Sequence, residues 1–408
     1  MLPVSSRAPH VDDFFDVSRL ELYRDNDWRD PFQHLRAHAP VQYVPHSSFG
    51  PYWSVSTYEQ IIEVESQPEM FSSEIGGFSI VPLEPDERHT PMFIGRDPPI
   101  HTEQRRTVAP AFAPSAILEV TDDLRRRTAE LLDSLPRGEP FDWVASVSRE
   151  LSIQMLAILF AFPWEDRARL GEWSDWMGDI EIMNNPALRE ARLGKMREAA
   201  FYFQGLWDER LQAPPRRDLL SMMIHSDTMS CMPFNELMGN LSLLIVGGND
   251  TTRSTMSGLV YALDKYPEER AKLEATPSLV ANAVSETIRW QTPVAHMART
   301  AVRDCTLLGR EIAAGDKLVL WYISANRDET IFGTDADAFR VERANARRHL
   351  SYGHGIHRCV GARLAELQVT ILLEEMLARA LRVKIVAQPK PTANCFIHGY
   401  SEMIAWID

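Results

Sequence analysis

The sequence predicts a mainly helical protein with small β-sheets at one side, and three observations support this prediction. Apolar residues recur every three to four positions over long stretches such as Leu151–Phe160 and Asp166–Met177. The stretch from Pro233 to Pro267 contains no internal proline, and a continuous helix of that length would run about 50 Å, across the whole molecule. The segments that favour strands are few and short.

Short segments rich in Val, Leu and aromatic residues predict the strands Val41–Val44, Tyr52–Val55, Lys317–Tyr322 and Val383–Val386. The turn-forming residues 47–51 join the first two strands. Thr276 followed by Pro277 predicts the start of a helix over Ser278–Trp290, with Thr276 as the cap. We expect one domain over residues 1–408, with a β-containing lobe at about 35–75, strands near the C-terminus and a helical core at about 100–380.

The composition is that of an acidic globular protein. There are 43 Lys and Arg against 57 Asp and Glu, a formal net charge of −14, and 45% of the residues are hydrophobic. Because neutralising phosphates needs a dense basic surface, nucleic acid is not expected as a main partner. The four cysteines show no paired spacing, which excludes a disulfide-rich secreted scaffold and favours a reducing compartment.

The first residues, Met1–Asp16, are polar and contain no apolar core of a signal peptide. The longest apolar run, Met155–Phe162, is far too short to span a bilayer. These two observations predict a cytoplasmic protein without a membrane anchor.

Five prolines lie between Pro82 and Pro99, around the apolar Met92–Ile94. This composition predicts a long irregular loop, of a kind that often forms a lid or a binding loop. A surface excursion without function is the alternative interpretation.

The long helix contains the unusual run Gly247–Thr252 at its middle. Two glycines cost about 1 kcal/mol each in a helix interior, but they let a flat and bulky group approach the backbone. Thr251 can donate to a carbonyl of the preceding turn, and the adjacent Asp250 supplies an acid that, with the alcohol, could relay protons to a ligand. A helix crossing that needs small residues is the alternative.

Cys359 lies among the three glycines Gly353, Gly355 and Gly361. Such a stretch can form a tight loop with inward amides, and the next segment, Ala362–Ala380, is strongly helical in composition. Amide donors and the positive end of a helix dipole stabilise a thiolate, and His357 and Arg358 add cationic character. A free cysteine is more often a small buried apolar residue, and the lack of a second cysteine within four residues argues against zinc.

Two charge pairs are less distinctive. Glu286 and Arg289 place a carboxylate and a guanidinium on one helix face, and His101 and Arg105 follow the sequence Asp-Pro-Pro. Alone, such pairs are usually solvated surface charges.

Together and in this order, the segments from about Phe71 to the C-terminus resemble the cytochrome P450 family of haem-thiolate monooxygenases. The cysteine stretch is similar to the family signature F-x-x-G-x-H/R-x-C-x-G, with Tyr352 in place of the usual Phe. The hydroxyl of Tyr352 could tune the sulfur or point away from it. The resemblance implies the cytochrome P450 fold, in which a long central helix lies over a haem b (iron protoporphyrin IX) with an axial thiolate from Cys359.

The resemblance also implies roles for individual residues. Asp250 and Thr251 are the catalytic acid–alcohol pair, and Glu286, Arg289 and Arg343 support the cofactor loop. The cofactor-binding residues implied are His101, Arg105, Gly247, Gly248, Arg299, Tyr352, Gly353, His357, Cys359 and Gly361.

The candidate substrate contacts are nearly all apolar, and each could belong to the core instead. They are Ile80, Val81, Leu83, Met92, Leu243, Leu244, Val294, Ala295, Phe396 and Ile397. Their shared chemistry suggests a substrate held by the burial of apolar surface.

Three segments, Phe162–Arg167, Gly247–Arg253 and Arg289–Met297, resemble the bacterial alkane hydroxylase branch. That branch oxidises terminal carbons of medium-chain alkanes and fatty acids; terpenoid or steroid hydroxylation is the alternative within the family. A peroxide-driven peroxygenase typically lacks the pair that Asp250 and Thr251 supply, and a non-catalytic haem protein does not need it.

Electrons must come from another protein, because the sequence shows no flavin domain and no cysteine cluster for iron–sulfur. A ferredoxin reduced by an NAD(P)H reductase is the expected partner of a monomeric enzyme. Since ferredoxins are acidic, docking needs a local basic patch, for which the candidates are Arg106, Arg347, Arg348 and Arg363. Ordinary solvated arginines are the alternative.

Overall fold

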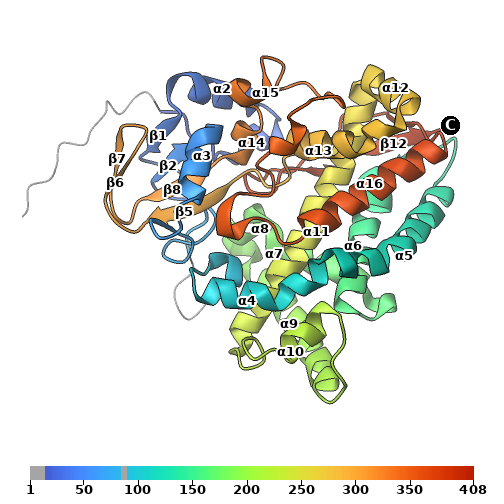
Figure 1. Cartoon of the computed structure of the whole chain (residues 1–408), viewed down its shortest axis with the longest axis horizontal. Helices are drawn as coiled ribbons and strands as arrows, with labels where there is room; N and C mark the ends of the chain where they lie inside the picture. Colours follow the sequence, from blue (N-terminus) through green and yellow to red (C-terminus); the bar gives the residue numbers. More distant parts are fainter. Residues whose placement is uncertain (1–13, 84–89) are drawn as a thin grey trace, which may run out of the picture.

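The computed structural model describes residues 14–83 and 90–408, and helices predominate in it, with the largest sheet at one side and a small sheet at the other side, near the C-terminus (Figure 1). This is the predicted fold class. Residues 1–13, within the stretch predicted to lack a signal peptide, and residues 84–89 of the predicted proline-rich loop lie outside the described residues.

The α-helices are α1 (Leu20–Arg24), α2 (Arg29–His38), α3 (Tyr58–Glu65), α4 (Ile100–Val108), α5 (Pro114–Asp133), α6 (Glu150–Phe160), α7 (Ala168–Gly178), α8 (Ile180–Asn184), α9 (Arg189–Leu211), α10 (Leu219–Ile224), α11 (Phe234–Lys265), α12 (Pro267–Ala275), α13 (Val280–Gln291), α14 (Tyr322–Ala325), α15 (Glu329–Phe332) and α16 (Ala362–Ala378).

The largest sheet joins strands from distant parts of the sequence. Its order is β1 (Val41–Val44), β2 (Tyr52–Val55), β8 (Lys317–Leu320), β5 (Met297–Ala301) and β3 (Phe71–Ser72). Only the β2–β8 pair is parallel within this sheet. Smaller sheets contain β4 (Phe141–Asp142), β12 (Ile404–Ile407) and β9 (Val383–Ile385), then β10 (Lys390–Pro391) with β11 (Tyr400–Glu402), and β6 (Cys305–Leu307) with β7 (Arg310–Ile312).

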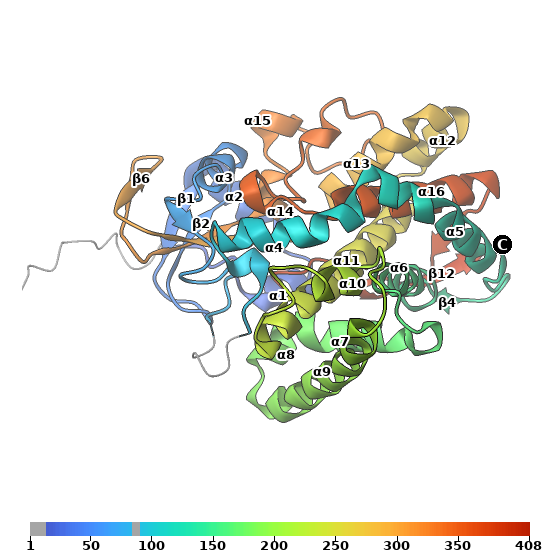
Figure 2. The same ribbon diagram turned by 60° about the horizontal axis from the view of Figure 1, so that its bottom comes forward.

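The predicted long helix is α11, which has 32 residues and runs from just after Pro233 to just before Tyr266. It packs against α6, α7, α13 and α16, and Figure 2 shows α7 lying between α11 and α9. The apolar residues of α11 fall into two clusters, one ending at Ile245 and the other beginning at Met256. The Gly247–Thr252 run lies between these clusters, so the middle of α11 is free to border a cavity.

Local structure follows the predictions with small differences. The predicted strands Val41–Val44 and Tyr52–Val55 are β1 and β2, whereas β8 ends at Leu320, because the chain turns into α14 at Tyr322. Thr276 does not cap a helix: its side chain makes no cap hydrogen bond, and a 3-10 turn over Pro277–Leu279 precedes α13. Among the helices in the described residues, none has the length and apolar content needed to cross a membrane.

Candidate active site

A cavity of about 350 Å³ lies between the middle of α11 and the loop that precedes α16. Gly247, Gly248 and Thr251 line it from α11, and Cys359 lines it from the loop. The two motifs that stood out in the sequence therefore share one cavity, although more than a hundred residues separate them.

The loop that carries Cys359 is shaped by its glycines. Gly353 and Gly355 have φ angles of +67° and +65°, a backbone conformation that side chains disfavour. A Cβ atom on Gly355 would also collide with the carbonyl oxygen of Glu65. The Cys359 amide donates to the Tyr352 carbonyl at 2.8 Å, which closes the loop just before α16. The thiol is thereby presented to the cavity.

Several groups act on the Cys359 thiol. Burial raises its pKa, while a hydrogen bond from the Gly361 amide and the charges of Arg105 and Arg358 act in the opposite direction. The loop amide and the basic neighbours were expected from the sequence, but burial outweighs them. Coordination to a metal ion stabilises the thiolate form of such a residue directly.

On α11, Gly247 leaves the helix surface open, whereas Gly248 lies against α6, where a Cβ atom would collide with Leu156 Cδ2 at 2.7 Å. A Cβ on Gly247 would have no neighbouring atom within 4 Å among the described residues, so this position faces open cavity. Thr251 lines the cavity, and its hydroxyl donates to the Gly247 carbonyl at 2.7 Å, as predicted for a threonine in mid-helix.

Asp250 points elsewhere. It is not among the described residues that line the cavity, and its Oδ1 accepts hydrogen bonds from Ser174 at 3.1 Å and Arg253 at 2.9 Å. Arg253 also binds Asp175 at 2.8 Å, and Arg149 binds the other oxygen of Asp175 at 2.7 Å. Burial raises the pKa of Asp250, and the charge of Arg253 opposes that rise. The carboxylate is thus linked through charged groups to the part-exposed Asp175.

Four predicted cofactor-binding residues meet at another wall of the cavity: His101, Arg105, Arg299 and His357. The rings of His101 and His357 lie 4.2 Å apart between centroids. Neither ring nitrogen of buried His101 has a hydrogen-bond partner within residues 14–83 and 90–408. Burial lowers the pKa of His101 to about 4 and that of His357 to about 2. His357 Nδ1 also lacks a partner in this part of the chain, whereas its Nε2 lies 3.1 Å from the Ser73 hydroxyl. These ring nitrogens beside two guanidinium groups form a setting suited to an anionic ligand group.

Glu65 at the end of α3 is a site residue that the sequence analysis missed. It lines the cavity and accepts from Arg299 Nη2 at 2.9 Å and from the Tyr322 hydroxyl at 2.6 Å. Its second carboxylate oxygen accepts from the His354 amide at 2.9 Å, in the cysteine loop. No pattern in the sequence of α3 marks this glutamate, because its partners come from segments far away in the chain.

Tyr352, which replaces the usual phenylalanine, also lines the cavity. Its hydroxyl is buried, without a hydrogen-bond partner in the described part of the chain. The ring lies at an edge-to-face angle to that of His349, with 5.2 Å between centroids.

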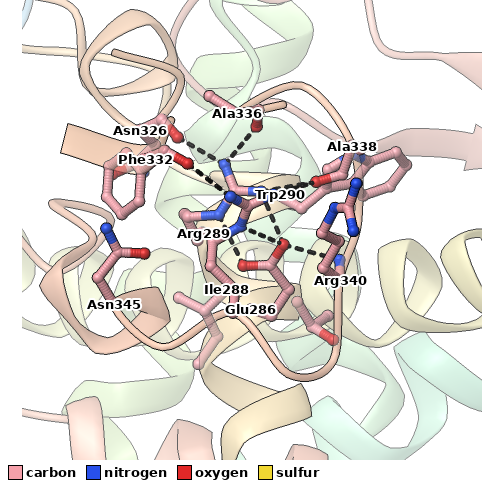
Figure 3. A network of polar contacts seen from close by, with 12 residues as sticks. Glu286, Ile288, Arg289, Trp290, Asn326, Phe332, Ala336, Ala338, Arg340 and Asn345 are labelled. Carbon is pink, nitrogen blue, oxygen red and sulfur yellow. Dashed lines mark hydrogen bonds and ion pairs between the residues drawn. The ribbon is translucent and has the colours of Figure 1, made fainter. Parts of the chain in front are cut away.

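The Glu286–Arg289–Arg343 group forms the buried network in Figure 3. The Arg289 guanidinium binds both oxygens of Glu286, at 2.7 and 2.8 Å, and Arg343 Nε binds Glu286 Oε1 at 3.0 Å. Arg289 also donates to the carbonyls of Asn326 and Ala336, both at 2.7 Å. The network therefore ties α13 to the chain that leads into the cysteine loop.

Six of the ten predicted substrate contacts line the cavity: Met92, Leu243, Leu244, Val294, Phe396 and Ile397. The other four do not. Ile80 and Ala295 are fully buried in a different apolar cluster, Val81 packs against that cluster, and Leu83 lies at the surface with 42% exposure. The lining also includes apolar residues that the sequence analysis did not name, among them Phe78, Met177 and Met196.

Comparisons with known proteins agree with this geometry. The Cytochrome P450 family model matches residues 278–396. Linalool 8-monooxygenase of Pseudomonas putida is 33% identical over 95% of this chain and 97% of that protein. The structure of CYP153D17 from Sphingomonas sp. PAMC 26605 is 59% identical, covers 98% of this chain and 100% of that one, and has a TM-score of 0.93. Cytochrome P450-153 from Novosphingobium aromaticivorans is 53% identical, covers 96% and 99%, and has a TM-score of 0.92.

The fold, the shared cavity and these relatives define a haem-thiolate monooxygenase. The chain belongs to the cytochrome P450 family. Its cofactor is haem, with the axial thiolate supplied by Cys359.

The residues of the cavity fit this cofactor. The open surface at Gly247 can accommodate a flat group. Both ring nitrogens of His101 and the Nδ1 of His357, which have no partner in the described part of the chain, suit the two carboxylates of a porphyrin together with Arg105 and Arg299. When bound, the haem supplies the activation of O₂ and the insertion of one oxygen atom into a C–H bond. The protein's part is to hold the substrate, exclude water and deliver protons.

Proposed function

We propose that this monooxygenase hydroxylates the terminal carbon of medium-chain alkanes or fatty acids. The observation that carries this proposal is the wall of the cavity on the substrate side, where apolar side chains such as Leu243, Leu244, Val294 and Phe396 converge. An alkyl chain of the substrate gains affinity in such a site by burial alone, at about 25 cal/mol per Å² of apolar surface.

The similarity to the CYP153 structures supports this substrate class over the terpenoid and steroid alternatives. Their identities of 53% and 59% are far above the 33% shared with the linalool enzyme. Two of the three segments that resemble the alkane hydroxylase branch, Gly247–Arg253 and Arg289–Met297, contain parts of the cavity wall, among them Gly247, Gly248 and Val294.

Asp250 and Thr251 divide the transfer of protons between them in this proposal. The Thr251 hydroxyl belongs to the cavity side of α11 and donates its one proton to the Gly247 carbonyl, which leaves its oxygen able to accept a hydrogen bond from a water that carries protons in the cavity. The Asp250 carboxyl, whose pKa is raised by burial, takes up protons through its polar partners at the α7 side. This arrangement favours an O₂-dependent monooxygenase over a peroxide-driven peroxygenase.

A ferredoxin reduced by an NAD(P)H reductase is the proposed electron donor to a monomeric, cytoplasmic enzyme. Exposed arginines stand near the cysteine loop on α4, on the 3-10 turn Ala346–Arg348 and on α16; they are Arg106, Arg347, Arg348 and Arg363. Their positive charge complements an acidic ferredoxin despite the net charge of −14 on the whole chain.

The experiment is a titration of the haem absorption spectrum with octane, dodecanoic acid, linalool and a steroid, followed by product analysis. We expect octane or dodecanoic acid to shift the spin state of the haem iron at a lower concentration than linalool or the steroid. The product should be the terminal alcohol. A response confined to linalool or the steroid would assign the enzyme to the alternative substrate class.

A further inference from the structure

One wall of the cavity contains a short segment, residues 78–81, whose backbone is bound by two side chains, one buried and one half-buried. Phe78 and Ser79 of this segment line the cavity, whereas Ile80 is buried behind it. The two side chains that bind the segment belong to His296, just before β5, and Lys317, the first residue of β8. Neither has a role in the family signature described above.

His296 joins the segment to the C-terminal loop. Its Nε2 lies 3.1 Å from the Ile80 amide and its Nδ1 lies 2.7 Å from the Cys395 carbonyl oxygen. An amide can only donate and a carbonyl can only accept, so Nδ1 must carry the proton and Nε2 must be bare. Burial lowers the pKa of His296 to about 3, which keeps this single neutral tautomer in place.

Lys317 binds the backbone carbonyl groups of the same segment. Its ammonium group lies 3.3 Å from the carbonyl oxygens of Ser79 and Ile80, and 3.4 Å from that of Val81. An ammonium has three donors, and here they are directed at three successive carbonyls. Since Lys317 and Thr300 are paired in the β5–β8 ladder, the hydrogen bonds of Lys317 tie residues 79–81 to the largest sheet.

The contacts of His296 and Lys317 lie next to one pair of aromatic rings, those of Phe78 and Phe396. Phe78 and Phe396 both line the cavity, and their ring centroids are 6.3 Å apart. The His296 ring packs on Phe396 with 5.2 Å between centroids. The backbone adds two bonds, from the Ala298 amide to the Phe78 carbonyl at 2.7 Å and from the Ala295 amide to the Phe396 carbonyl at 2.8 Å.

We propose that His296 and Lys317 are positioning residues that fix Phe78 and Phe396 as a rigid wall and so decide which carbon of the substrate is oxidised. The proposal rests on the proposed function, because an alkyl chain has many similar C–H bonds. How far the chain slides into the cavity then determines which of these bonds is oxidised. A wall that moves by about 1 Å, roughly the spacing of successive carbons along the chain, admits a subterminal carbon to the same position.

The test uses holoenzyme variants with octane and dodecanoic acid. His296→Phe keeps the ring and removes both hydrogen bonds, and Lys317→Met keeps the length and removes the ammonium. We expect the ratio of terminal to subterminal alcohol to fall at least fivefold in each, with a raised KM. The carbon-monoxide band of the reduced haem should stay that of a thiolate complex. His296→Gln, whose amide can both donate and accept, should restore much of the ratio.

Two further variants separate positioning from general damage. Lys390→Met removes an exposed lysine that pairs with Glu402, away from the cavity, and should leave the ratio unchanged. Phe78→Leu alters the wall directly, and because His296 acts partly through Phe78, the double variant with His296→Phe should lower the ratio by less than the two single effects combined. An unchanged ratio in folded His296→Phe and Lys317→Met, or additive effects with Phe78→Leu, would overturn the proposal.

Failure of the proposed function gives a different pattern. If the wild type oxidises only linalool or the steroid, the same variants are measured on that compound, by the distribution of its hydroxylated isomers. A changed distribution supports the positioning role even then, and an unchanged one contradicts it.

Discussion

The carboxylate of Asp250 and the guanidinium of Arg253 meet at 2.9 Å on the side of α11 that faces α7. Thr251, between them in sequence, lines the cavity instead, with its hydroxyl bonded to the Gly247 carbonyl. Neighbouring residues of a helix point about 100° apart, so one short run serves two sides of α11. The acid and the alcohol are therefore not a contacting pair; water or motion must connect them.

This separation predicts the behaviour of Asp250→Asn. The variant should bind haem and substrate normally, because Asp250 lines neither site, yet form product at least tenfold more slowly, since a positioned acid contributes about 10²–10⁴-fold. Product formation with a surrogate redox chain measures the loss. Ser174→Ala, which removes only one partner of the carboxylate, is the matched control and should lose less. Equal rates for wild type and Asp250→Asn would exclude Asp250 from proton delivery.

Replacing the alcohol should have a different signature. Thr251→Ala should retain haem and consume reducing equivalents, while the share of them recovered as hydroxylated product falls severalfold, because the hydroxyl that directs protons in the cavity is gone. The measurement is the ratio of product formed to NAD(P)H consumed. Thr251→Ser keeps a hydroxyl and should recover most of the ratio. Full coupling in Thr251→Ala would remove its proton-relay role.

The buried Glu286 network predicts a large loss of stability. Glu286→Gln leaves Arg289, which is 0% exposed, without its counter-ion, and breaking such a buried pair costs about 3–5 kcal/mol. Haem content and the thermal midpoint of the holoprotein should both fall. Glu274→Gln breaks a part-exposed pair with Arg270 and should cost less than about 1 kcal/mol. Similar losses in the two variants would argue against a special supporting role for Glu286.

Buried histidines predict how stability depends on pH. Burial lowers the pKa of His398 to about 3. Between about pH 6.5 and 3, His398 is therefore protonated in the unfolded chain but neutral in the folded protein. The contribution to stability is therefore full above pH 6.5 and is lost as the pH falls, by at most about 1.4 kcal/mol per pH unit. Urea unfolding at pH 7, 6 and 5 measures the free energy of unfolding at each pH. This free energy should fall less steeply with falling pH in His398→Gln than in the wild type. Parallel slopes would show that His398 is protonated in the folded protein.

The exposed arginines near the cysteine loop predict a salt-dependent electron transfer. Arg347→Glu and Arg363→Glu should slow reduction by an acidic ferredoxin about tenfold at low salt and much less at high salt, because screening weakens the interaction of exposed charges. Stopped-flow reduction of the haem measures the rate. Arg382→Glu, which changes an exposed arginine directly before β9, is the control. Equal slowing by all three substitutions would point to net charge rather than to a docking patch.

The amino-acid sequence by itself determined the helical class, the length of α11, the first two strands and the two motifs that meet at the cavity. These follow from local rules, since prolines end helices, glycines open a backbone and a periodic apolar pattern marks a helix. Only the tertiary structure decided which side chains share a wall. Glu65 meets Arg299 across 234 positions of sequence, and Ile80 and Ala295 turn into a neighbouring cluster although Phe78 and Val294 line the cavity. Such contacts depend on how distant segments pack against one another, which local patterns do not encode.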